Sequence, residues 1–140
     1  ARNMRDMAML SVPVICIVIG EGASGGAIGI GLGDRVFMLE NTWYSVISPE
    51  NCSAILWRSW DYKEQAAEAM KVTAEDMTGF GLVDGIIKEP LGGAHTDMKW
   101  QAAQIKKIIL KSIKELQALD VDQMIESRIN KFCGMGVVQE

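Results

Sequence analysis

The sequence predicts an α/β fold with parallel strands, and three features support this prediction. Val14 to Ile19 form a continuous apolar run, mostly β-branched, which is typical of a strand buried on both faces of a parallel sheet. A glycine-rich stretch over residues 20–33 follows at once and holds seven of the chain's 14 glycines. Short apolar runs then alternate with helix-forming segments. No linker or repeat interrupts the pattern, so we expect one globular domain.

Three other segments have the composition of strands. Residues 36–39 form a short apolar run after Asp34 and Arg35, and residues 41–47 are aromatic and β-branched enough to be extended. A turn into a last buried strand is expected over residues 82–87.

Helix signals lie before and after these strands. Apolar residues recur at helical spacing over residues 4–10. The stretch Ser48-Pro49-Glu50 supplies an N-cap, a proline at the first helical position and an acid in the first turn, so a helix is expected from there through Trp57 or Trp60. Further helices are expected over residues 61–70, 73–79, 98–119 and 122–132.

The longest of these helices, residues 98–119, is amphipathic. At the helical period of about 100° per residue, apolar residues gather on one side and lysines on the other, with Leu110 as an exception on the lysine side. The first group comprises Ile105, Ile108, Ile109, Ser112, Ile113, Leu116 and Leu119, and the second Lys106, Lys107, Lys111 and Lys114. The lysine side is expected to be a solvated face.

Composition excludes several classes of protein. The chain has 140 residues, 49% of them hydrophobic, and a net charge of −4, which excludes a disordered tail and makes a nucleic-acid partner unlikely on charge grounds. No apolar run approaches the roughly 20 residues of a membrane helix, so we expect a soluble protein and no membrane partner. Cys16, Cys52 and Cys133 lack metal-ligand or disulfide spacing, which favours a reducing cytoplasm.

Residues 20–25 match the G-x-G-x-x-G pattern of dinucleotide-binding folds. The pattern follows a predicted strand, and Glu40 lies 20 residues after Gly20, where the ribose-binding acid of such folds is found. However, only about nine residues remain before the next strand, whereas a parallel crossover usually takes a dozen or more. The dinucleotide interpretation is therefore disfavoured.

Residues 22–26 also match G-x-S-x-G, the nucleophile elbow of serine hydrolases. Ser24 would be the nucleophile, and Asp84 and His95 follow it in the order that such triads use. His95 is the chain's only histidine, and nothing beside it in the sequence marks it as a base. A serine peptidase or hydrolase using Ser24 is kept as the alternative.

A third interpretation uses the backbone instead of side chains. A strand that ends in glycines and enters a short helix leaves unpaired N–H groups at the helix N-terminus. Such donors can stabilise an enolate or another oxyanion, and glycine at Gly25 and Gly26 lets a planar carbonyl approach them. Equally, these glycines could serve close packing of the helix on the strand.

Five motifs, in order and at similar spacing, resemble the carboxyltransferase alpha subunits of bacterial-type acetyl-CoA carboxylase. They are Val-Pro-Val-Ile-Cys-Ile-Val-Ile-Gly-Glu-Gly-Ala-Ser-Gly-Gly-Ala (12–27), Tyr-Ser-Val-Ile-Ser-Pro-Glu (44–50), Ile-Leu-Trp-Arg-Ser (55–59), Gly-Leu-Val-Asp-Gly-Ile-Ile (81–87) and Glu-Pro-Leu-Gly-Gly-Ala-His (89–95). The resemblance extends from Ala1 to about Leu119. Ala23 stands where a glycine is usual in the family, which keeps a small residue in the loop.

The resemblance implies a crotonase-like fold of repeated β-β-α units with C-terminal helices. It implies transfer of a carboxyl group from carboxybiotin, on the biotin carboxyl carrier protein, to acetyl-CoA, giving malonyl-CoA for fatty acid biosynthesis. By similarity, Gly25 and Gly26 would give backbone amides to the ureido oxygen of biotin, and Gly22 and Ser24 would contact substrate. A beta subunit, in an assembly of two alpha and two beta chains, would supply a second oxyanion hole and the zinc ribbon, so no metal is expected on this chain.

The resemblance also implies that residues 1–140 are the C-terminal part of a single carboxyltransferase domain whose N-terminal units are absent. Part of the apolar content is then expected at the surface, under the missing units and the beta subunit. Four aromatic side chains are expected to be core or subunit-interface anchors: Trp57, Trp60, Phe80 and Trp100. A folded assembly domain with no site of its own is the non-enzymatic alternative.

Overall fold

The structure is a computed structural model that describes residues 2–136 and contains seven helices and five strands in that range. In chain order the elements are α1 (Arg2–Ala8), β1 (Ile15–Val18), β2 (Glu21–Ala23), α2 (Ser24–Ile30), β3 (Arg35–Leu39), β4 (Trp43–Ser45), α3 (Pro49–Trp57), α4 (Lys63–Met70), α5 (Ala74–Gly79), β5 (Gly85–Ile87), α6 (Met98–Leu116) and α7 (Val121–Cys133).

The strands form two parallel sheets. The larger sheet has the order β1-β3-β5, with Cys16 opposite Val36 and Met38 opposite Ile86. The smaller sheet pairs β2 with β4 and places Gly22 opposite Tyr44. The predicted α/β class with parallel strands is therefore confirmed.

Local capping signals begin two of the helices where the sequence predicts. The Ser48 hydroxyl accepts a hydrogen bond from the Asn51 N–H at 3.3 Å and caps α3. Thr73 and Asp76 form a reciprocal capping box at the start of α5. These bonds satisfy amides that have no partner within the helix.

Burial of β1 differs from the prediction. Only Cys16 is buried in this strand, its other residues are half-buried, and the next residue, Ile19, is 71% exposed. The reason is position, because β1 is an edge strand of the larger sheet while β3 is central. The core accordingly centres on Val36 and Met38 of β3, together with Met77 of α5.

The four aromatic residues named above do not form the core of the described chain. Their exposed fractions are 36% for Trp57, 63% for Trp60, 59% for Phe80 and 39% for Trp100. Of the two places predicted for them, core or subunit interface, the exposed fractions exclude the core of residues 2–136. Anchoring at a subunit interface stays a prediction.

Helix α6 has the amphipathic pattern expected of it. Ser112 and Leu116 are buried, and Leu110 is 56% exposed on the lysine side. The helix ends at Leu116 and not at Leu119, which lies beyond it and is 42% exposed.

A buried arginine joins both ends of the described chain to the larger sheet. Arg128 of α7 is 1% exposed, and its guanidinium donates to both carboxylate oxygens of Asp34, at 2.9 and 2.8 Å. It also donates to carbonyl oxygens of four residues that end α1 or follow it: Met7, Ala8, Leu10 and Val12. Asp34 in turn accepts the Val14 N–H at 2.7 Å, so α1, α7 and the starts of β1 and β3 are held together.

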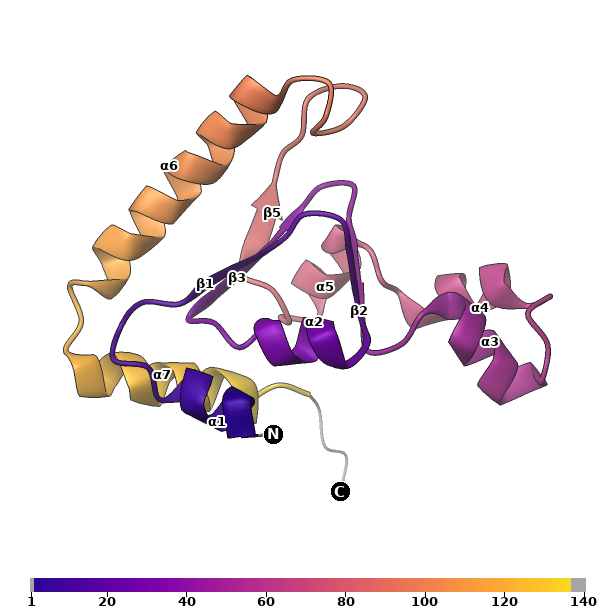
Figure 1. Cartoon of the computed structure of the whole chain (residues 1–140), viewed down its shortest axis with the longest axis horizontal. Coiled ribbons are helices and arrows are strands. Elements are labelled where there is room, and N and C mark those ends of the chain that lie inside the picture. The colour runs from indigo at the N-terminus through magenta and orange to yellow at the C-terminus, as the bar shows by residue number, and fades with distance from the viewer. Residues whose placement is uncertain (1, 137–140) are drawn as a thin grey trace.

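Figure 1 shows how these elements are arranged. Helix α6 runs along one side of the larger sheet, α1 and α7 lie next to each other below it, and α3 with α4 projects from the opposite side. Among residues 2–136, no helix is both long and apolar enough to cross a membrane.

Candidate functional site

The glycine-rich segment forms a sharp strand-to-helix turn. Strand β2 ends at Ala23 and α2 begins at Ser24, whose φ of 63° lies in the left-handed region that side chains other than glycine rarely adopt. Strain of this kind persists where surrounding structure imposes it and often marks functional sites.

The first turn of α2 lacks a side-chain cap. Its N-cap residue, Ala23, has no side-chain oxygen that could accept a hydrogen bond, and no side-chain cap bond is present there. An N-cap side chain normally accepts from the second or third helical N–H, and here these belong to Gly25 and Gly26. The two amides are therefore available as donors to a group outside the helix.

Space is open beside the same two glycines. A Cβ added to Gly25 or Gly26 would meet nothing within 4 Å, and both residues are exposed. Neither has the positive φ that would require glycine for conformational reasons. Packing within residues 2–136 and backbone conformation therefore leave the choice of glycine unexplained at both positions.

Other glycines of the segment do serve packing. A Cβ on Gly22 would lie 2.8 Å from Cδ2 of Tyr44, one on Gly31 would lie 2.2 Å from the Tyr44 hydroxyl, and one on Gly33 would lie 2.7 Å from Sγ of Cys16. Real Cβ contacts are essentially never that short. The segment thus serves packing at these three residues, while the donor role of Gly25 and Gly26 and the contact of Gly22 or Ser24 with substrate stay predictions.

The structure does not bring the suggested hydrolase triad together. Asp84 precedes β5 and is bound by the Val36 N–H at 2.6 Å and by the Lys131 ammonium. His95 lies in the loop after β5, so the acid and the histidine occupy opposite ends of this strand. Because Asp84 is engaged at the far end, it cannot orient His95, and the hydrolase alternative is disfavoured.

The dinucleotide interpretation also lacks support from the geometry. Glu40 accepts the Lys88 ammonium at 2.5 Å and the Glu89 N–H at 3.2 Å, and these bonds lower the pKa of its carboxyl. Glu89 reciprocally accepts the Asn41 N–H at 2.6 Å. The acid that would bind a ribose instead joins the chain after β3 to the chain after β5.

Among residues 2–136, no cluster of three or more His, Cys, Asp or Glu side chains is placed to hold a metal ion. The three cysteines are free thiols. Cys16 donates a hydrogen bond to the Ile30 carbonyl at 3.0 Å, and burial raises the pKa of its thiol.

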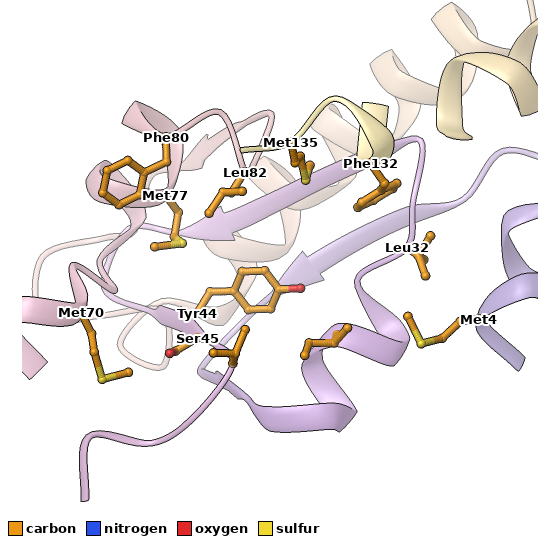
Figure 2. A pocket seen from close by; sticks show the side chains of 12 residues that line it. Met4, Leu32, Tyr44, Ser45, Met70, Met77, Phe80, Leu82, Phe132 and Met135 are labelled. Atoms are coloured by element: carbon orange, nitrogen blue, oxygen red, sulfur yellow. The ribbon is translucent and has the colours of Figure 1, made fainter. Parts of the chain in front are cut away.

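Two cavities adjoin the glycine-rich segment, and sequence reasoning missed the residue between them. A cavity of about 350 Å³ lies along β1, β2 and α2, and an apolar one of about 480 Å³ lies between α2, α5 and α7. Tyr44 lines both, and Figure 2 shows its ring extending across the middle of the larger one. Its motif was noted in the sequence, but its role depends on the register of β2 with β4.

Comparison with known proteins gives a consistent family. The acetyl co-enzyme A carboxylase carboxyltransferase-like family matches residues 1–136. Proteins named acetyl-coenzyme A carboxylase carboxyl transferase subunit alpha are 59% identical in Chlorobium limicola, 60% in Pelodictyon phaeoclathratiforme and 57% in Flavobacterium psychrophilum, each over 140 residues and all of this chain. The chain spans 42%, 42% and 44% of their respective lengths.

Two solved structures share the fold. A Pseudomonas malonate decarboxylase hetero-tetramer, solved in complex with coenzyme A, aligns with a TM-score of 0.70 at 14% identity over 94% of this chain and 51% of its own. Transcarboxylase 12S, with methylmalonyl-coenzyme A bound, aligns with a TM-score of 0.62 at 15% identity over 81% of this chain and 22% of its own. The crotonase-like α/β fold expected from the sequence is confirmed.

Proposed function

The chain belongs to the acetyl co-enzyme A carboxylase carboxyltransferase-like family, and from this premise we propose that it forms part of a carboxyltransferase alpha subunit. The proposed reaction moves a carboxyl group from carboxybiotin to acetyl-CoA and gives malonyl-CoA, the first committed step of fatty acid biosynthesis. The observation that carries the proposal is the uncapped, open first turn of α2.

The residues present suit such a reaction. Carboxyl transfer needs donors for a developing oxyanion and no side-chain nucleophile. The amides of Gly25 and Gly26 sit at the positive end of a helix and have no side-chain acceptor at the N-cap, so they can hold negative charge on a carbonyl oxygen. Open space beside both glycines suits the approach of a flat ring.

Biotin, held on its carrier protein and not on this chain, would supply the carboxyl group. Gly25 and Gly26 would bind its ureido oxygen and stabilise negative charge there. The carrier protein and acetyl-CoA are therefore proposed partners of the assembly. A cytoplasmic location is part of the same proposal and is supported by the free thiols, which a reducing compartment preserves.

A beta subunit is the proposed protein partner, in an assembly of two alpha and two beta chains. Exposed apolar side chains support an association of this kind. They include Ile19, Ile30, Val46, Ile55, Leu56 and Trp60, each more than 60% exposed. We expect this chain to be inactive alone, and failure of the alpha and beta subunits to co-purify would count heavily against the proposal.

The test compares two substitutions in the full-length subunit assembled with the beta subunit. Activity is measured as carboxyl transfer from malonyl-CoA to free biotin. Gly26→Val should abolish transfer, because helical Cβ atoms tilt toward the N-terminus and this one would cover the donor amides. Ser24→Ala should change the rate of carboxyl transfer little. Under the hydrolase alternative, the same substitution would instead abolish hydrolysis.

Two controls separate a blocked site from a damaged fold. Valine is a better helix former than glycine, so Gly26→Val should not lower the thermal midpoint. Gly29→Ala adds a Cβ to the same helix where nothing lies within 4 Å, and it should leave transfer unchanged. Normal transfer by Gly26→Val would refute the proposed role of the amides.

A further inference from the structure

Helix α2 is not held by a buried apolar face of its own. It has seven residues, three of them glycine, and none of its residues is buried. A helix this short has little stability in isolation, so contacts from outside must fix it on the sheet. Because the proposed donors lie in its first turn, whatever fixes α2 also fixes the donors.

Tyr44 is seated against both ends of this helix. Its ring occupies the space that a side chain at Gly22, before α2, would fill, and its hydroxyl occupies the space at Gly31, the C-cap of α2. Figure 2 shows the ring extending from β4 with its hydroxyl end toward the side of Leu32. The missing side chains of Gly22 and Gly31 therefore leave a notch, which the Tyr44 ring and hydroxyl fill.

A hydrogen bond holds the Tyr44 side chain in this notch. The Tyr44 hydroxyl donates to the Ala27 carbonyl at 3.2 Å, and the Gly31 N–H donates to the same oxygen at 2.9 Å. The backbone on the other side is fixed as well, because the Tyr44 N–H donates to the Val72 carbonyl at 3.0 Å. Burial, and then the nearby Cys16, raise the pKa of Tyr44, so the hydroxyl keeps its proton as a donor at neutral pH.

We propose that Tyr44 is a positioning residue that sets the place of the Gly25 and Gly26 amides by anchoring α2 in the notch formed by Gly22 and Gly31. Tyr44 acts through the helix and does not itself touch the reacting group. Displacing donors by a fraction of an ångström weakens their interaction with a developing charge. The proposed function assigns these amides to biotin, so binding of malonyl-CoA is not expected to depend on them. The kinetic part of this inference rests on the proposed function, whereas the anchoring rests on geometry alone.

The first experiment uses Tyr44→Phe, which keeps the ring in the notch and removes only the bond to Ala27. Tyr62→Phe is the matched control, because Tyr62 is the chain's other tyrosine and is 46% exposed. In the full-length subunit with its beta subunit, we expect Tyr44→Phe to lower kcat for transfer from malonyl-CoA to biotin by about 3- to 10-fold, the range of one lost hydrogen bond. The KM for malonyl-CoA should stay unchanged, and Tyr62→Phe should match the parent enzyme.

The second readout follows the helix directly. Hydrogen exchange of the peptide that contains α2 should be faster in Tyr44→Phe than in the parent and in Tyr62→Phe. Unchanged exchange would overturn the anchoring, and faster exchange with an unchanged kcat would overturn the positioning role. If the parent enzyme transfers no carboxyl group, the proposed function fails instead, and exchange still decides whether Tyr44 anchors α2.

A double-mutant cycle tests the notch. Gly22→Ala should lower the thermal midpoint sharply in the parent, because its Cβ would collide with the Tyr44 ring. In a Tyr44→Ser background the ring is gone, and the remaining close contact is with Cγ1 of Val18 at 3.1 Å, which a shift of a few tenths of an ångström would relieve. The added effect of Gly22→Ala should then be much smaller, and an equal effect in both backgrounds would refute the pairing of Gly22 with Tyr44.

Discussion

Replacing Arg128 with methionine should be among the most destabilising single changes in this fold. Arg128→Met keeps an apolar side chain of similar length and removes the guanidinium. The Asp34 side chain, 2% exposed, would remain as a buried carboxylate without a cationic partner, and four carbonyl oxygens near α1 would lose the guanidinium as a donor. Removing one member of a buried ion pair costs about 3–5 kcal/mol, a large share of the roughly 5–15 kcal/mol that stabilises a domain.

Urea denaturation at neutral pH, followed by circular dichroism, measures this loss. With a slope of about 1–3 kcal/mol/M, the midpoint should fall by at least about 1 M. Arg5→Met is the matched control, because Arg5 is 79% exposed and its pair with Asp6, at 3.8 Å, should be worth less than about 1 kcal/mol.

A double variant tests the cause of the effect. Adding Asp34→Asn to Arg128→Met removes the orphaned charge and should recover part of the lost stability. The reasoning is refuted if Arg128→Met unfolds within about 1 kcal/mol of the parent protein. If the double variant is no more stable than Arg128→Met alone, the buried charge of Asp34 is not the cause of the loss.

Three smaller effects are expected. Gly29→Ala should add about 0.5–1 kcal/mol of stability, since alanine favours the helix and its Cβ meets nothing within 4 Å, and a lower thermal midpoint would contradict this. Thr73→Ala removes the capping box with Asp76 and should lower the free energy of unfolding by about 1 kcal/mol, as measured by urea denaturation. An unchanged midpoint would show that the cap does not stabilise the fold. Lys88 lowers the pKa of Glu40, so this pair stabilises the fold above the ordinary glutamate pKa and is lost as pH falls through the lowered value. The stability difference between the parent and Glu40→Gln should therefore shrink when denaturation is repeated at about pH 3, and a constant difference would argue against the pair.

Local signals in the sequence predicted local structure well. The caps at Ser48 and Thr73 depend on residues within three positions, so they could be recognised without knowledge of the fold. The donor role of Gly25 and Gly26, which the glycine-rich strand-to-helix pattern suggests, stays a prediction. The open space beside them became visible only in three dimensions, because it depends on what does not pack there.

Features that depend on distant residues escaped prediction. Arg128 and Asp34 are 94 residues apart, and nothing in the sequence around either residue indicates the other. The packing of Tyr44 against Gly22 and Gly31 depends on the register of β2 with β4, which the hydrophobic periodicity of the sequence does not reveal. Burial of β1 was overestimated because an apolar run does not distinguish an edge strand from a central one.

Helices α3 and α4 project from the rest of the fold, and this position affects how the protein unfolds locally. The two helices make their extensive contacts with each other, and they stand apart from the larger sheet in Figure 1. Their mutual contacts can therefore be lost without disturbing the residues around Val36 and Met38. We expect this hairpin to unfold as a separate cooperative unit, so that native-state hydrogen exchange would release its amides at a lower free energy than those of β3.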